Sequence, residues 1–190
     1  MMTQSHALLA MALFGKPNSN ARCLGAVSGG LLPDLTMLYM YGVERLRGNS
    51  DAKIFNELYF SDAWQEVFAI NNSAPVFAVI ALVAFMLSRL VGWLWALSFS
   101  FALGLGALLH ALFDLPLHHD DGHPHFWPLT NWIYESPVSY WDPRHYGTWA
   151  SNIELAFIAG VSIYLWVKFK RLYQRILVGL LFGSYVAMII

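Results

Sequence analysis

The feature that most constrains this chain is a run of twenty uncharged residues, Leu90 to Leu109, rich in Leu, Phe, Trp, Ala and Gly. A helix of about 20 apolar residues is long enough to cross the hydrocarbon core of a bilayer. The composition agrees, since 57% of the residues are hydrophobic and 12% are charged, against about 45–50% and about 25% in soluble domains. The sequence therefore predicts a protein embedded in the lipid bilayer.

Three further apolar segments, Val67 to Ser88, Trp149 to Val167 and Ile176 to Ile190, are also predicted to span the membrane. Two earlier segments, Ala7 to Phe14 and Leu24 to Leu32, are too short to cross it independently at 1.5 Å per residue. A turn rich in Gly, Pro and Asn separates them, which indicates a helical hairpin packed inside the bundle. We expect an all-α, polytopic membrane bundle with about four full spans and a short N-terminal hairpin.

This organisation makes residues 1–190 a single membrane-embedded domain. Its expected parts are the hairpin (1–35), an interfacial segment (36–66), two spans (67–114), a loop rich in His and Trp (115–148) and two more spans (149–190). Loops as long as the one over 115–148 are usually functional.

The charged residues exclude some classes of function and predict an orientation. With 11 basic and 12 acidic residues the net charge is −1, so no basic excess is present to bind nucleic acid. The single Cys23 excludes an intramolecular disulfide and any multi-cysteine metal site.

Threading the expected spans back and forth places seven basic and no acidic residues on one side: Lys16, Arg22, Arg89, Lys168, Lys170, Arg171 and Arg175. Such a side is expected to be cytoplasmic. All seven His fall on the other side, so we expect a bacterial inner-membrane protein whose chemistry lies at the periplasmic face.

His110 and Asp114 close the strongest span, and their i, i+4 spacing places both side chains on one helical face. That is the spacing of metal ligands, although a polar cap at the end of a membrane helix explains this pair equally well. Six more polar residues follow within eight positions: His118, His119, Asp120, Asp121, His123 and His125. Mixed imidazole and carboxylate groups suit a divalent Zn, Mn or Fe ion. The competing interpretation is a solvated loop within an aromatic interfacial belt.

Two distant residues are candidates to complete this site. His6 starts the first apolar segment and Asp34 follows the second, so the hairpin brings both to the face of His110 and Asp114. Taken singly, a His near a terminus is more often incidental than a ligand, and Pro33-Asp34 is typical of the start of a turn or helix. Together the four residues would form a centre of two His and two Asp, which leaves room for a bound water that the metal activates as a nucleophile.

These segments resemble a known family. His6-Ala7-Leu8-Leu9, Gly29 to Asp34 and Gly106 to Asp114 are similar to motifs of the YdjM-like family of membrane-bound, predicted metal-dependent hydrolases. The resemblance covers roughly the first two thirds of the chain. It implies that His6, Asp34, His110 and Asp114 are metal ligands.

The chain departs from the family pattern at two places. Thr36 replaces the second acid of a Pro-Asp-x-Asp motif, and Asn71-Asn72-Ser73 stands where the family often has a His-containing motif. Asn72 and Ser73 are expected to hydrogen-bond a substrate or a bound water. We expect Asp142 and His145 to supply replacement ligands, although a structured turn explains them equally well.

Three other polar residues are candidates for the reaction. Glu154 lies inside a span, where an ionised carboxylate needs a partner, so it is expected to be a general base, a metal ligand or a structural partner. His118 and Arg144 are expected to contact substrate, and Arg144 is the only basic residue in its loop.

The function expected from these residues is hydrolysis of a lipid-linked or membrane-proximal substrate at the outer face. Metal-bound water would be the nucleophile, with Asp114 or Glu154 as general base. The alternative is a non-catalytic membrane protein that binds or delivers a divalent metal through its His-rich loop. A Gly179-x-x-x-Gly183 pattern is compatible with a homo-oligomer.

Overall fold

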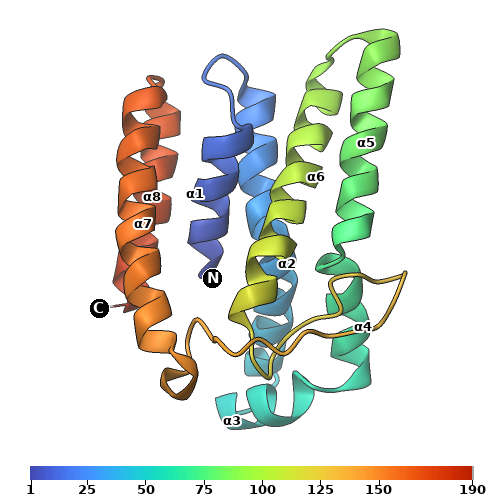
Figure 1. Ribbon diagram of the computed structural model, residues 1–190, viewed down its shortest axis with the longest axis vertical. Coiled ribbons are helices and arrows are strands. Elements are labelled where there is room, and N and C mark those ends of the chain that lie inside the picture. The colour runs from blue at the N-terminus through green and yellow to red at the C-terminus, as the bar shows by residue number, and fades with distance from the viewer. Residues whose placement is uncertain (190) are drawn as a thin grey trace.

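The computed structural model describes residues 1–189, which form a bundle of helices in which no β-strand occurs (Figure 1). The all-α prediction is therefore confirmed. Ile190, the last residue of the fourth predicted span, lies outside the described residues. The elements are α1 (Thr3–Phe14), α2 (Asn20–Leu46), α3 (Asp51–Lys53), η1 (Ile54–Leu58), α4 (Asp62–Asn71), α5 (Ala74–Val91), α6 (Trp95–Asp114), η2 (Leu115–Leu117), η3 (Pro143–His145), α7 (Gly147–Lys168) and α8 (Leu172–Ile189).

Five helical segments of the described chain are long and apolar enough to cross a membrane. They are α2, the stretch Asp62–Val91 that contains α4 and α5, the stretch Trp95–Leu117 that contains α6, then α7 and α8. Large apolar side chains on the outer faces of α5, α7 and α8, such as Leu82, Ile163 and Leu180, are more than half exposed in the isolated chain. Surfaces of this kind suit contact with lipid, because the hydrocarbon core of a bilayer is itself apolar.

The hairpin is present, but its second arm is longer than the sequence indicated. α2 runs for 27 residues and contains Pro33, where the short arm was expected to end. Beyond the proline, Met37, Met40 and Tyr41 pack on a cluster of η1 and α4 residues that includes Ile54 and Phe68. This packing offsets the hydrogen bond that a proline removes from a helix.

The boundary between the next two spans also differs from the prediction. Leu90 and Val91, the expected start of the strongest span, are the last residues of α5. Gly92 adopts a φ of 81°, which favours glycine, and α6 begins at Trp95. The turn therefore lies at residues 92–94, and Arg89 is in the last turn of α5.

The connections place the basic and the His-bearing segments at opposite ends of the bundle (Figure 1). The α1–α2, α5–α6 and α7–α8 turns lie together at one end, whereas the loop from α6 to α7 crosses the other end beside α3 and α4. With 12 residues, α1 is shorter than α2 and α6, and its first turn lies part way along the bundle (Figure 1). Residues in the first turn of α1 are therefore enclosed by longer helices.

Glycine permits the close packing that encloses these residues. A Cβ on Gly106 of α6 would lie 2.6 Å from the Ala26 carbonyl oxygen of α2. A Cβ on Gly30 of α2 would lie 2.7 Å from both the Cα of Ala7 and the carbonyl oxygen of His6. The backbones of α1, α2 and α6 thus meet at His6, which has an exposed fraction of 1%.

We expect Gly30→Ala to lower the free energy of unfolding by about 1–3 kcal/mol, because the methyl group overpacks the α1–α2 contact. Gly42→Ala is the matched control in the same helix, since its Cβ would meet no atom within 4 Å in the described chain. That variant should be neutral or slightly stabilising. Thermal unfolding of both variants in detergent checks the difference, and equal stability would contradict the packing account.

Candidate metal centre

His6, His110 and Asp114 meet in the interior of the bundle. Their ligand atoms all lie within 4.8 Å of one another, and all three side chains are buried. His6 Nε2 is 2.8 Å from Asp114 Oδ1, and His110 Nε2 is 3.0 Å from Asp114 Oδ2. The two imidazole rings stack with their centroids 3.7 Å apart. α1 and α6 therefore bring together three residues of the expected ligand set.

The hydrogen bond at the other side of the His110 ring determines which nitrogen is free to bind a metal. His110 Nδ1 lies 2.8 Å from the Gly30 carbonyl oxygen, which accepts hydrogen bonds only, so Nδ1 carries a proton and donates it. Nε2 then holds a lone pair directed at Asp114 Oδ2 unless a second proton or a metal ion lies between them. Nε2 lies 3.0 Å from Asp114 Oδ2, so this arrangement suits either a second proton on His110 or a metal ion between the two atoms.

Asp34, the fourth expected ligand, lies at the edge of this group. Its Oδ1 is 3.5 Å from His110 Nε2, and its Oδ2 accepts a hydrogen bond from Thr3 Oγ1. The side chain is 22% exposed, against 4% for Asp114. Asp34 therefore contacts both the buried group and the space outside it.

The Asp114 carboxylate also receives positive charge from the α-ammonium group of Met1, which lies 2.8 Å from Oδ1. A positively charged group can therefore lie next to the buried Asp114 carboxylate. Two imidazoles and one carboxylate match the ligand types that Zn, Mn and Fe share, so the residues present fit a divalent metal.

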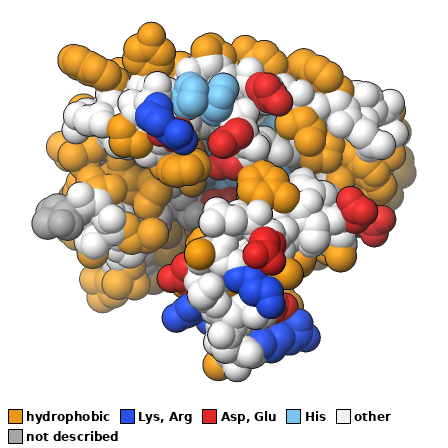
Figure 2. All heavy atoms as spheres, turned by 90° about the horizontal axis from the view of Figure 1, so that it is seen from below, with side chains coloured by type: hydrophobic (Ala, Val, Ile, Leu, Met, Phe, Trp, Pro, Cys, Tyr) orange, Lys and Arg blue, Asp and Glu red, His pale blue; other side chains and the backbone are white. Residues whose placement is uncertain are grey.

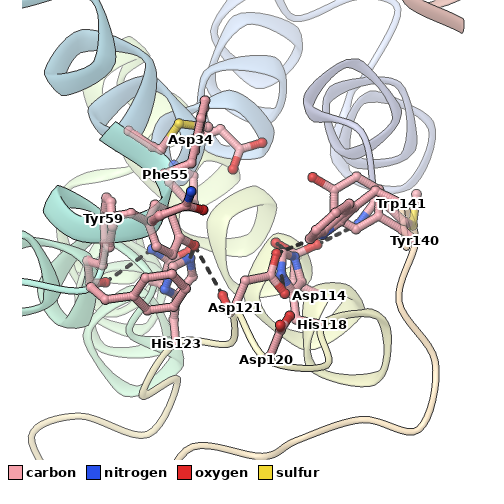
Figure 3. A pocket seen from close by; sticks show the side chains of 17 residues that line it. Asp34, Phe55, Tyr59, Asp114, His118, Asp120, Asp121, His123, Tyr140 and Trp141 are labelled. Atoms are coloured by element: carbon pink, nitrogen blue, oxygen red, sulfur yellow. Dashed lines mark hydrogen bonds and ion pairs between the residues drawn. The ribbon is translucent and has the colours of Figure 1, made fainter. Parts of the chain in front are cut away.

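A pocket of about 550 Å³ opens beside Asp114 at the end of the bundle that carries the long loop. From this end, acidic and His side chains surround a hollow, while hydrophobic side chains cover much of the rest of the face (Figure 2). Within the pocket, Asp114, His118 and Asp121 lie between Tyr59 on one side and Trp141 on the other (Figure 3). The metal-ligand group is therefore reached from the His-bearing end.

His118, expected to contact substrate, lies between two carboxylates in this pocket. Its Nε2 is 3.5 Å from Asp114 Oδ2 and its Nδ1 is 3.0 Å from Asp121 Oδ1. Burial lowers the pKa of His118, but the charges of Asp114 and Asp121 outweigh burial and raise the pKa to about 9. Through these two contacts His118 links the buried group to the loop.

Glu154, expected as a general base, is occupied elsewhere. Its Oε1 accepts hydrogen bonds from the Met2 amide at 2.9 Å and from Ser5 Oγ. This explains how a carboxylate inside the α7 span is satisfied, and it attaches the start of α1 to α7. Glu154 is not part of the His6, His110 and Asp114 group. The structure gives it a positioning role for α1.

Asp142 and His145 do not join the metal-ligand group, which corrects the expectation that they supply replacement ligands. Asp142 accepts hydrogen bonds from the backbone and guanidinium of Arg144 and lies 3.2 Å from His145 Nδ1. Hydrogen bonds from Arg144 hold the pKa of Asp142 well below its usual range. The side chain caps η3, so the structured-turn interpretation describes this segment. Arg144 itself is 79% exposed and pairs with Asp142.

The remaining two expected substrate contacts are largely used within the protein. Asn72 lines the pocket, but its side-chain amide donates to the Phe68 carbonyl. Ser73 caps α5 by accepting from the Val76 amide and donates its hydroxyl hydrogen to the Trp127 carbonyl. Ser73 is not among the residues that line the pocket.

Several pocket residues were not predicted from the sequence. Tyr59, whose hydroxyl donates to the Asp121 carbonyl, comes from a segment expected only to lie at the interface. Trp141, which was expected in an aromatic belt, donates its indole N–H to Asp121 Oδ2 at 2.9 Å. Neither residue belongs to a spacing pattern: Tyr59 comes from a distant segment, and Trp141 lies 20 residues further along the same loop.

The chain matches no known protein-family model, no curated protein and no solved structure. Function therefore has to be inferred from the geometry and chemistry of this centre.

The burial of His123 predicts an acid-sensitive stability. Burial, with smaller contributions from His118 and His125, lowers the pKa of His123 from 6.5 to about 3. Below pH 6.5 the unfolded chain binds a proton at His123 that the folded chain does not. The free energy of unfolding should therefore fall by up to about 1.4 kcal/mol per pH unit as the pH drops from 6.5 towards 3.

Melting temperatures measured between pH 7 and pH 4 in detergent check this expectation. His123→Gln should show a shallower loss of stability on acidification than the unsubstituted protein. His119→Gln controls for removal of a loop imidazole. Parallel curves for His123→Gln and the unsubstituted protein would contradict the assignment.

Proposed function

We propose that this protein is an integral-membrane, metal-dependent hydrolase that acts on a lipid-linked or membrane-proximal substrate. The observation that carries the proposal is the buried group of His6, His110 and Asp114, whose ligand atoms all lie within 4.8 Å of one another. When bound there, a divalent metal ion would supply Lewis acidity to water and to the scissile bond.

The residues divide into distinct roles in this proposal. His6, His110 and Asp114 hold the metal, and the Gly30 carbonyl orients the His110 ring through Nδ1. Asp34 is the carboxylate that accepts a proton from water, because it lines the open pocket and lies 3.5 Å from His110 Nε2. This role for Asp34 replaces the expected roles of Asp114 and Glu154 as general base.

The resemblance to the YdjM-like family supports the same proposal. The motif residues that the resemblance assigns to metal binding are the ones that converge, with Asp34 at the edge. Thr36 replaces the second acid of the family motif, so fewer carboxylates are present for catalysis. This difference favours the metal-carrier function as the second candidate. Measurement of bound metal and of turnover separates the two.

His110→Ala and Asp114→Ala should each remove most of the metal that co-purifies with the full chain, because each supplies one of the three buried ligands found among residues 1–189. His145→Ala is the matched control, since His145 lies outside the group. Elemental analysis of protein purified in detergent gives the metal content per chain. Retention of stoichiometric metal by both ligand variants would refute the centre.

Asp34→Asn should keep the metal but lower turnover by about 10²–10⁴-fold, the usual contribution of a general base. The assay is release of product from a panel of phospholipids and lipid-linked phosphates by metal-loaded protein. Bound metal with no turnover on any member of the panel would favour the carrier. Loss of metal from Asp34→Asn would make Asp34 a ligand.

The charge distribution supports an inner-membrane location with the pocket facing the periplasm. Basic residues gather at the end with the short turns, which the positive-inside rule assigns to the cytoplasm. In a Cys23→Ser background, Asp120→Cys should react with a membrane-impermeant maleimide in intact spheroplasts, whereas Lys170→Cys should react only after permeabilisation. The reverse pattern would invert the orientation.

A further inference from the structure

The pocket beside the candidate metal centre has an excess of negative charge. Four carboxylates line it, Asp34, Asp114, Asp120 and Asp121, and no Lys or Arg of residues 1–189 does. The α-ammonium group of Met1, which lines the same pocket 2.8 Å from Asp114 Oδ1, offsets one of these charges, and a divalent metal at the buried end would offset two more. An acidic surplus remains at the mouth, where Asp120 is exposed. Such a pocket disfavours an anionic end group and favours a cationic one.

Aromatic side chains face this acidic pocket from two sides. Phe55 and Tyr59 come from η1 and its C-terminal end, and Tyr140 and Trp141 come from the loop before η3 (Figure 3). Phe55 and Trp141 are 44% and 52% exposed, so their rings are accessible to a ligand. Aromatic faces combined with carboxylates are the usual means of binding a quaternary or primary ammonium group.

A second, apolar groove of about 400 Å³ adjoins the pocket. It lies between the end of α6 and the start of α7, and its walls include Phe113, Trp149, Ile153 and Phe157. Met1 lines both the groove and the acidic pocket. Because α6 and α7 are long and apolar enough to span a membrane, the groove faces lipid, and an acyl chain is the occupant that such surroundings supply.

We infer that the ligand of this site is an amphiphile with an ammonium-bearing head group, such as a zwitterionic phospholipid or its lyso form. The ammonium group binds in the acidic, aromatic pocket, and the acyl chain lies in the groove between α6 and α7. For the cleavage of this ligand the inference rests on the proposed function. Its binding does not depend on a metal or on turnover.

The test compares lysophosphatidylcholine and lysophosphatidylglycerol that carry the same fluorescent acyl chain. Fluorescence anisotropy measures their binding to the full chain in micelles of an uncharged detergent with chelator present, so that no turnover interferes. The choline probe should bind at least about tenfold more tightly, the effect of one favourable cation–π contact with a carboxylate nearby. Equal affinity of the two probes would overturn the inference.

Substitutions at the pocket should remove this preference. Asp120→Asn and Trp141→Ala should each reduce it severalfold, whereas Asp62→Asn, an exposed acid on α4 outside the pocket, should leave it unchanged. Choline should compete with the probe, and its uncharged isostere 3,3-dimethylbutan-1-ol should not. A preference that survives both pocket substitutions, or equal competition by the isostere, would show that the pocket does not recognise the ammonium group.

The groove is tested by filling it. Ala150 lines the groove, so Ala150→Phe should weaken both labelled probes at least about fivefold, whereas Ala156→Phe on an exposed position of the same helix should not. If choline alone bound as tightly as the lysolipid, the ligand would be a soluble amine. If Ala150→Phe changed the oligomeric state and not the affinity, a second copy of the chain would occupy the groove.

These outcomes are separable from those of the proposed function. A protein that binds no metal and hydrolyses nothing can still prefer the choline probe, and this would refute the hydrolase while supporting the ligand class. A metal-loaded protein that hydrolyses an anionic lipid and shows no choline preference would refute the ligand class alone.

Discussion

The buried carboxylate of Asp114 is the interaction on which the arrangement of this bundle depends. With an exposed fraction of 3%, it requires compensating partners from several elements. His6 of α1, His110 one turn earlier on α6 and His118 of the loop all lie within 3.5 Å of its oxygens. The contacts of the Asp114 carboxylate thus join α1, α6 and the loop between α6 and α7 at one point.

The close approach of the helices and the shortness of α1 are the second constraint. Small residues bring α1, α2 and α6 together, and Glu154 attaches the start of α1 to α7. The acidic pocket and the apolar groove both border Met1, next to the first turn of α1. The same geometry therefore buries the candidate ligand group and leaves it next to an open pocket.

The candidate site was predictable where short spacing or a recognisable motif placed residues on one helical face. His110 and Asp114 follow from i, i+4 spacing, and His6 follows from the hairpin. Asp142 and His145 have similar spacing but form a local turn with Arg144, because an arginine two residues from an aspartate is the nearer partner. Tyr59 and Trp141 reach Asp121 from segments 62 and 20 residues away, and no local pattern encodes such contacts.

The sequence by itself determined that this chain is a helical membrane protein with basic turns at one end and His at the other, because hydropathy and charge act locally along each span. It also contained the three candidate ligands of the buried group, His6, His110 and Asp114. Only the tertiary structure decided that α2 continues through Pro33, that Glu154 supports α1 and that Asp34 lies at the pocket edge. Those outcomes depend on packing between distant helices, where the partner available in space, and not the neighbour in sequence, determines how a helix ends or a charge is satisfied.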